Sequence, residues 1–144
     1  MIVLDTNVLS EIIKPSPTKA VLTWLACQSR STVYITAITQ AETLFGVERL
    51  PVGKRRTRLY DDIEDLLARE FQGRILPFDD AAAPVFARIA GNRASMGRPI
   101  SQFDAMIAAI ARSRGASVAR SPGCRRERRA PPRDAARGSP AHPP

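Results

Sequence analysis

The sequence has almost none of the residues on which thiol and imidazole chemistry depend. Cys27 and Cys124 are its only cysteines, and its single histidine, His142, stands near the end of the chain. Two isolated cysteines make neither a disulfide framework nor a zinc site, so we interpret them as reduced thiols. The position of His142 excludes mechanisms that need a histidine base or ligand in the preceding residues.

Long apolar runs are also missing. The first run, residues 2–4, is interrupted by Asp5, whereas a membrane-spanning helix needs about 20 apolar residues and a signal peptide needs a continuous apolar segment. We therefore expect a cytoplasmic protein with no membrane attachment. With 144 residues, of which 44% are hydrophobic, the chain is long enough for one domain with a substantial core.

Acidic residues are fewer than basic ones, and the basic excess is concentrated at one end. Residues 1–119 carry 15 Lys and Arg against 12 Asp and Glu, whereas residues 120–144 carry 7 Arg against Glu127 and Asp134. The second segment also holds 6 of the 12 prolines and almost no large apolar side chain, so it cannot form a core. We therefore divide the chain into a domain of residues 1–119 and a basic Pro/Arg-rich tail of residues 120–144.

Apolar periodicity in the first segment predicts strands that alternate with helices. Short runs rich in β-branched and apolar residues predict strands, and the segments between them have helical spacing of Leu, Ile and Val. The expected strands are residues 2–4, 32–36, 75–78 and 116–119, and the expected helices are residues 8–14, 18–27, 40–50, 54–71, 81–93 and 101–114. Strands separated by helices indicate an α/β fold with a parallel sheet.

Three acidic residues stand where they reach one rim of such a sheet. Asp5 ends the first strand, Glu42 falls in the first turns after the second strand, and Asp104 lies near the start of the last helix. Ligands of open parallel sheets bind beyond the carboxyl ends of the strands. Carboxylates without histidine or cysteine suit Mg²⁺ or Mn²⁺, and a cation held in this way binds a phosphodiester oxygen and activates water.

Some of these acids also have a purely structural interpretation. The segments 39–42 and 101–104 both fit the spacing of a helix capping box, in which the acid serves its own helix. Asn7 either caps the first helix or orients Asp5. Asp5 is less easily explained, because a carboxylate at the end of a buried strand is costly unless it has a partner.

Together, the acid-bearing segments resemble those of PIN-domain ribonucleases, in particular the VapC-type toxins of bacterial toxin–antitoxin pairs. The segments are IVLDTNVLSE at residues 2–11, ITQAETLFG at residues 38–46 and FDAMIAA at residues 103–109. The resemblance covers about residues 1–119. The order and spacing of the three segments make it far more specific than any single motif.

This resemblance implies a PIN-like three-layer sandwich with a central parallel sheet, and a cytoplasmic endoribonuclease that depends on Mg²⁺ or Mn²⁺. Asp5, Glu42 and Asp104 would be the catalytic, metal-binding carboxylates, with Thr6 and Asn7 as supporting polar groups. The resemblance further implies an RNA substrate, a homodimer and a cognate antitoxin that neutralises the toxin. Operator DNA would be contacted through the antitoxin.

The resemblance ends after Ala119. Family members continue into a Thr-Arg-Asn-like turn, a further acid and a closing strand, whereas this chain reads Arg120-Ser121-Pro122. We therefore expect the last strand to be missing or altered, the fourth strand to have an unpaired edge, and metal binding and nuclease activity to be impaired.

Two hypotheses account for the composition of the tail. Of residues 120–144, 19 are Arg, Pro, Ala or Gly, which have GC-rich codons, so the reading frame could have been altered near codon 120. The alternative is a disordered basic arm that binds RNA.

Other functions are compatible with part of the pattern. A catalytically inert antitoxin-binding module, or a DNA-bound co-repressor subunit, would keep the fold without the chemistry. A phosphoryl-transfer enzyme with an aspartyl nucleophile is disfavoured, because similar folds use a lysine late in the chain and all three lysines here come early, at positions 14, 19 and 54.

Overall fold

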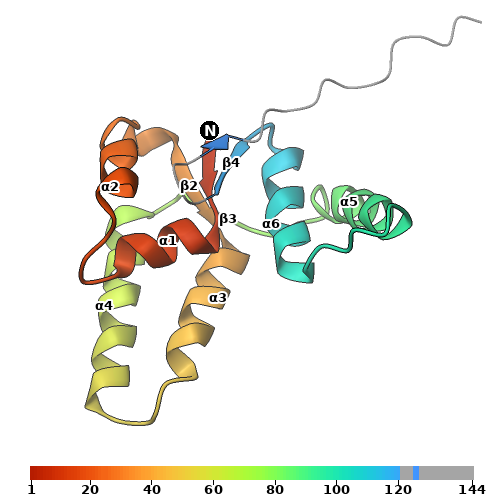
Figure 1. The fold of residues 1–144 in the computed structure, drawn as a ribbon. Coiled ribbons are helices and arrows are strands. Elements are labelled where there is room, and N and C mark those ends of the chain that lie inside the picture. The colour runs from red at the N-terminus through yellow and green to blue at the C-terminus, as the bar shows by residue number, and fades with distance from the viewer. Residues whose placement is uncertain (121–124, 127–144) are drawn as a thin grey trace, which may run out of the picture.

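The computed structural model describes residues 1–120 and the two-residue strand 125–126. A five-stranded sheet lies between two groups of helices (Figure 1). In chain order the elements are β1 (Ile2–Leu4), α1 (Thr6–Ile13), α2 (Lys19–Ala26), the 3-10 helix η1 (Arg30–Thr32), β2 (Val33–Thr36), α3 (Ala37–Glu48), α4 (Lys54–Glu70), β3 (Ile75–Leu76), α5 (Ala83–Ser95), α6 (Gln102–Ser113), β4 (Ser117–Arg120) and β5 (Arg125–Arg126). Within the described residues, no helix is long and apolar enough to cross a membrane.

The strand order is β3-β2-β1-β4-β5, and the first four strands run parallel. This confirms the predicted α/β architecture with a central parallel sheet. The predicted elements have the right type and order, with ends that differ by up to three residues. β3 stops at Leu76, two residues early, because Pro77 has no N–H to donate to a neighbouring strand.

The expectation of an unpaired edge on β4 is wrong. β4 pairs with the antiparallel strand β5, so that Arg120 lies opposite Arg125 and Ala119 opposite Arg126. The closing strand therefore exists but is only two residues long. The rest of the tail, on which the frame-change and basic-arm hypotheses depend, lies outside the described residues.

Each face of the sheet has its own hydrophobic core. Helices α1–α4 cover one face, and α5 and α6 cover the other (Figure 1). Side chains alternate between the faces along β1: Ile2 and Leu4 belong to the core beneath α1–α4, and Val3 belongs to the core beneath α6. Because β1 has a neighbour on both edges and helices on both faces, all three side chains are buried, which stabilises the fold by about 1.5–3 kcal/mol for each.

A glycine sets the turn from α6 into β4. Gly115 has φ +65°, and its N–H donates to the carbonyl of Arg112 while the N–H of Ala116 donates to the carbonyl of Ala111, at 3.2 and 2.8 Å. These two bonds form a Schellman motif, which needs a residue in the left-handed conformation that glycine adopts without strain. The turn brings β4 alongside β1.

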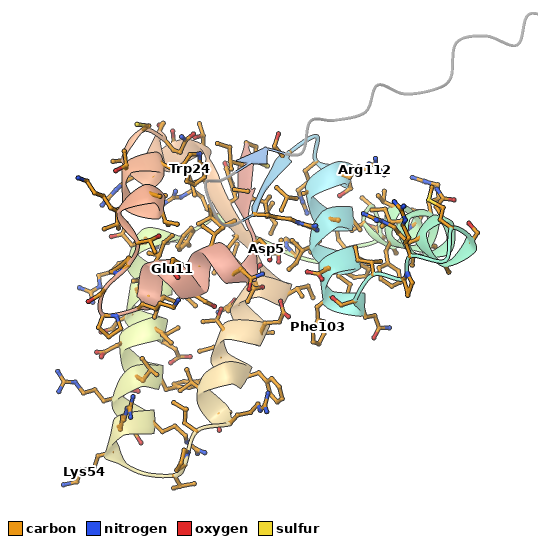
Figure 2. All side chains as sticks on the ribbon, viewed as in Figure 1. Asp5, Glu11, Trp24, Lys54, Phe103 and Arg112 are labelled. Carbon is orange, nitrogen blue, oxygen red and sulfur yellow. The ribbon has the colours of Figure 1, made fainter. Side chains whose placement is uncertain are left out.

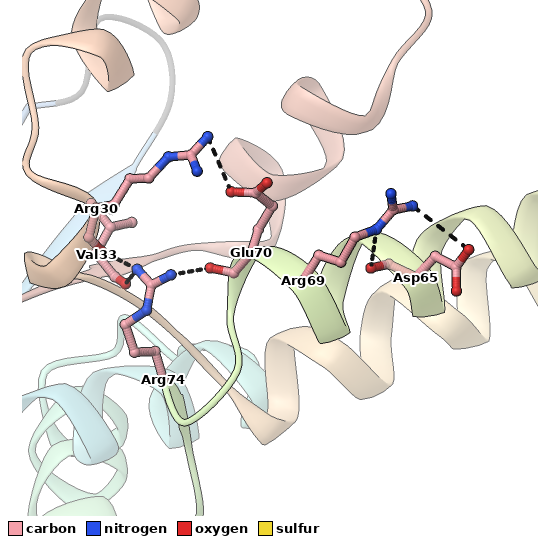
Figure 3. A network of polar contacts seen from close by, with 6 residues as sticks. All are labelled: Arg30, Val33, Asp65, Arg69, Glu70 and Arg74. Atoms are coloured by element: carbon pink, nitrogen blue, oxygen red, sulfur yellow. Dashed lines mark hydrogen bonds and ion pairs between the residues drawn. The ribbon is translucent and has the colours of Figure 1, made fainter.

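A clasp of polar contacts, centred on Arg74, holds the end of α4 against the start of β2 (Figure 3). The Arg74 guanidinium donates to the backbone carbonyls of Arg30, Val33 and Glu70, with 3.0 Å to the Val33 oxygen. It also lies over the Phe71 ring, 5.7 Å from the ring centroid. One planar, five-donor group thus satisfies three carbonyls from two segments of the chain, η1–β2 and the end of α4, which the single ammonium of lysine cannot match.

We predict that Arg74→Met lowers the free energy of unfolding by about 1–3 kcal/mol, because partly buried carbonyls lose their donor. The matched control is Arg69→Met. Arg69 forms an exposed ion pair with Asp65 at 3.6 Å (Figure 3), so its loss should cost no more than about 0.5 kcal/mol. Urea unfolding measures both variants, and equal destabilisation would contradict the clasp.

Candidate functional site

Asp5 lies at the point where β1 runs into α1. Its backbone is extended (φ −69°, ψ 156°) and it occupies the N-cap position of the helix. Figure 2 shows it between the start of α1 and α6. Asp5 is only 5% exposed, and the other buried polar residues of the described part of the chain are both threonines. The strand therefore carries one carboxylate into the protein at the rim where parallel sheets bind ligands.

Burial raises the pKa of the Asp5 carboxyl above its ordinary value of 3.8. The positive charge of Arg120 lowers this pKa, whereas the negative charge of Asp104 raises it further. Hydrogen bonds from the backbone N–H groups of Thr6 and Asn7 also lower this pKa. Burial prevails over these stabilising contacts, so the ionised carboxylate lacks a full complement of partners.

Thr6 links the end of β1 to α3. Its hydroxyl donates a 2.5 Å hydrogen bond to Oε2 of Glu42. The predicted capping box of residues 39–42 is therefore wrong: Thr36 is the N-cap of α3 and accepts from the Thr39 N–H at 3.0 Å, and Thr39 is already helical. Because α3 starts directly after β2, Glu42 is carried toward Thr6, which directly follows Asp5.

Asp104 approaches Asp5 from α6, and its negative charge acts on the Asp5 carboxyl. Here the capping interpretation is confirmed. Ser101 is the N-cap of α6; its Oγ accepts from the Asp104 N–H at 3.1 Å and donates to Asp104 Oδ2 at 2.7 Å. Asp104 is half-buried, so the same carboxylate serves its helix and faces the candidate site.

The three predicted carboxylates approach one rim but do not form a tight cluster. Within residues 1–120, no three His, Cys, Asp or Glu side chains are close enough to hold a metal ion as they are placed. Like charges at one rim repel each other, and each acid has a partner of its own: Arg120 for Asp5, Thr6 for Glu42 and Ser101 for Asp104. As a donor set, three carboxylates with hydroxyls beside them fit Mg²⁺ or Mn²⁺.

Asn7 does not cap the first helix, as one interpretation of the sequence held. α1 begins one residue earlier, at Thr6, and Asp5 takes the cap position. The Asn7 side chain is exposed in the first turn, while its backbone N–H acts on the Asp5 carboxyl. Any support that Asn7 gives Asp5 in this structure therefore comes from its backbone.

Sequence reasoning missed Arg120. Composition assigned it to the tail, but it is the last residue of β4, and its Nε lies 3.6 Å from Asp5 Oδ2. The available signal was strand register: a charged residue ending the strand next to β1 stands beside the residue that ends β1.

Comparison with known proteins places this geometry in a family. The PIN domain model matches residues 2–122. The chain belongs to the PIN-domain family. It is 43% identical to the VapC ribonuclease Y4jK of Sinorhizobium fredii, over 83% of this chain and 85% of the relative, and 40% identical to the toxin FitB of Neisseria gonorrhoeae, over 83% and 86%. It is thus a homologue of the VapC and FitB toxins.

Solved PIN-domain structures have the same fold. The structure of FitAB bound to an IR36 DNA fragment superposes with a TM-score of 0.75 at 40% identity, covering 82% of each chain. Further neighbours are a DNA-bound VapBC from Salmonella typhimurium and a member of the VapBC family of toxin–antitoxin systems from Mycobacterium tuberculosis. The expected PIN-like fold is confirmed.

We predict that Asp5→Asn stabilises the folded protein at pH 7, and that the gain shrinks as the pH falls. The folded state binds the Asp5 proton more tightly than the unfolded state, because burial raises the pKa. Ionisation of Asp5 therefore costs stability above that pKa, and the cost disappears at low pH, where the residue is protonated in both states. An amide resembles the protonated form at every pH.

Urea unfolding in EDTA, from pH 7 towards pH 4, measures the effect. Asp61→Asn, on the exposed surface of α4, is the control and should change the stability by no more than about 0.5 kcal/mol. A loss of stability in Asp5→Asn at pH 7 would show that the ionised carboxylate is well paired, contrary to our interpretation.

Proposed function

We propose that this protein is a metal-dependent endoribonuclease toxin of the VapC/FitB type, which hydrolyses RNA phosphodiester bonds. The observation that carries the proposal is the buried carboxylate of Asp5, at the carboxyl end of the central strand. Its pKa is raised by burial and by the negative charge of Asp104. Keeping an underpartnered carboxylate inside a protein is costly. A divalent cation would stabilise the ionised carboxylate and would at the same time make Asp5 a metal ligand in catalysis.

Asp5, Glu42 and Asp104 would hold Mg²⁺ or Mn²⁺. When bound, such a cation supplies Lewis-acid stabilisation of charge on the phosphodiester and lowers the pKa of a water molecule. The protein's own contribution is placement. Thr6 orients Glu42 through its 2.5 Å hydrogen bond, and Ser101 fixes one oxygen of Asp104 at 2.7 Å, so a neighbouring hydroxyl orients each of these two carboxylates.

The partners follow from the family. The FitAB and VapBC neighbours include structures bound to DNA, and we propose that this chain binds a cognate antitoxin. We also propose that it forms a homodimer and acts in the cytoplasm. Contact with operator DNA would be made through the antitoxin. We propose impaired activity relative to an intact family member, because the family's further acid is not matched in residues 1–120 and because Arg120 stands beside Asp5.

A second candidate function is a catalytically inert co-repressor subunit. The observation in its favour is the Arg120–Asp5 ion pair, which already partly neutralises the central carboxylate. Such a subunit would bind an antitoxin and DNA without cleaving RNA, so a cleavage assay separates the two candidates.

We predict that the purified full-length protein cleaves RNA in Mn²⁺, that EDTA stops cleavage, and that Asp5→Asn reduces the rate by more than about 100-fold. This exceeds the 10- to 100-fold typical of groups that only support a metal ligand. Asp61→Asn is the control of equal charge change and should leave the rate unaltered. Absence of metal-dependent cleavage in the wild-type protein would favour the inert subunit.

Thr6 provides a finer test of the same site. Thr6→Val removes the hydroxyl that holds Glu42 and keeps the shape of the side chain, so it should reduce cleavage by about 10- to 100-fold. Thr6→Ser keeps the hydroxyl and should retain most of the rate. If both variants match the wild-type protein, Glu42 needs no support from Thr6.

A further inference from the structure

The register of the two central strands places an arginine beside the buried acid. β1 and β4 are parallel, with Leu4 opposite Ala119, and the Asp5 N–H donates to the Ala119 carbonyl at 3.0 Å. One residue further along each strand, Asp5 and Arg120 are neighbours. Because side chains alternate along extended strands, both point toward the face covered by α6, the helix that carries Asp104.

The contact between Asp5 and Arg120 is an ion pair without a hydrogen bond. Nε of Arg120 lies 3.6 Å from Oδ2 of Asp5. Within the described part of the chain this Nε is buried and has no hydrogen-bond partner, although the Arg120 side chain as a whole is 33% exposed. The guanidinium is therefore held near Asp5 by charge rather than by directional bonding. Because the Arg120 side chain is partly exposed, the guanidinium can move toward solvent.

We propose that the Arg120 guanidinium competes with the divalent cation for the Asp5 carboxylate, and that cation binding requires this side chain to move away. The inference rests on the proposed function, in which Asp5 holds the cation. A guanidinium and a divalent cation repel each other when both adjoin one carboxylate in a poorly solvated site. Arg120 thus lowers the affinity of the site for metal and makes the protein a weak metal binder until the side chain is displaced.

Three substitutions separate charge from structure. Arg120→Gln removes the positive charge and keeps a polar side chain, and Arg120→Lys keeps the charge. Arg112→Gln removes an exposed arginine near the opposite end of α6 from Asp104 (Figure 2), which controls for the general effect of net charge. Asp5→Asn tests whether the bound cation sits at the proposed site. Circular dichroism verifies folding, and Arg120→Thr, with a β-branched residue suited to a strand, replaces Arg120→Gln if that variant does not fold.

The measurement is calorimetric titration of Mn²⁺ into each EDTA-stripped, full-length protein at one fixed pH. We expect Arg120→Gln to bind Mn²⁺ at least 10-fold more tightly than the wild-type protein, with Arg120→Lys and Arg112→Gln close to wild type. Equal or weaker binding by Arg120→Gln, together with loss of binding in Asp5→Asn, would overturn the competition and leave the proposed site intact. Binding that survives Asp5→Asn, or no Mn²⁺ binding by any variant, would overturn both.

Discussion

The burial of one carboxylate at the end of the central strand organises the candidate site. Asp5 is carried inside by β1, whose three residues are fixed by strands on both edges and by a core on each face. The backbone of Asp5 is held in place as well, because its N–H donates to the Ala119 carbonyl at 3.0 Å. Its negative charge is only partly compensated, because Arg120 Nε lies 3.6 Å from Asp5 Oδ2 and Asp104 adds a second negative charge. A residue so placed is a persistent cost to stability, and cation binding is the function that would use it.

The neighbouring groups depend on the same strand-to-helix junctions. α3 follows β2 without a connecting loop because Thr36 ends the strand and caps the helix, and this brings Glu42 within reach of the Thr6 hydroxyl. At the other end, the Schellman turn at Gly115 leads α6 into β4 and sets the register that places Arg120 beside Asp5. The Glu42 carboxylate, the Thr6 hydroxyl and the Arg120 guanidinium are thus positioned by the backbone geometry of strands and helices rather than by flexible loops.

Local pattern was sufficient to predict the order of strands and helices, the parallel sheet and the position of Asp5 at the end of a buried strand, because β-branched runs, helical periodicity and a charge ending an apolar run are short-range signals. It was insufficient wherever a tertiary partner decided the outcome. Glu42 has the spacing of a capping acid, yet the helix begins earlier and its carboxylate bonds to Thr6. Arg120 has the composition of the tail, yet it completes β4. Neither partner could be recognised before the strands were paired.

The most direct test of the central claim is anomalous diffraction from crystals of the full-length protein grown with Mn²⁺. We predict an anomalous peak about 2.0–2.2 Å from an Asp5 oxygen, which is the distance expected for a small, hard divalent cation. Asp104 or Glu42 should be a further ligand, and the Arg120 guanidinium should be displaced. A protein that binds Mn²⁺ only elsewhere, while Asp5 keeps its pairing with Arg120, would contradict the account.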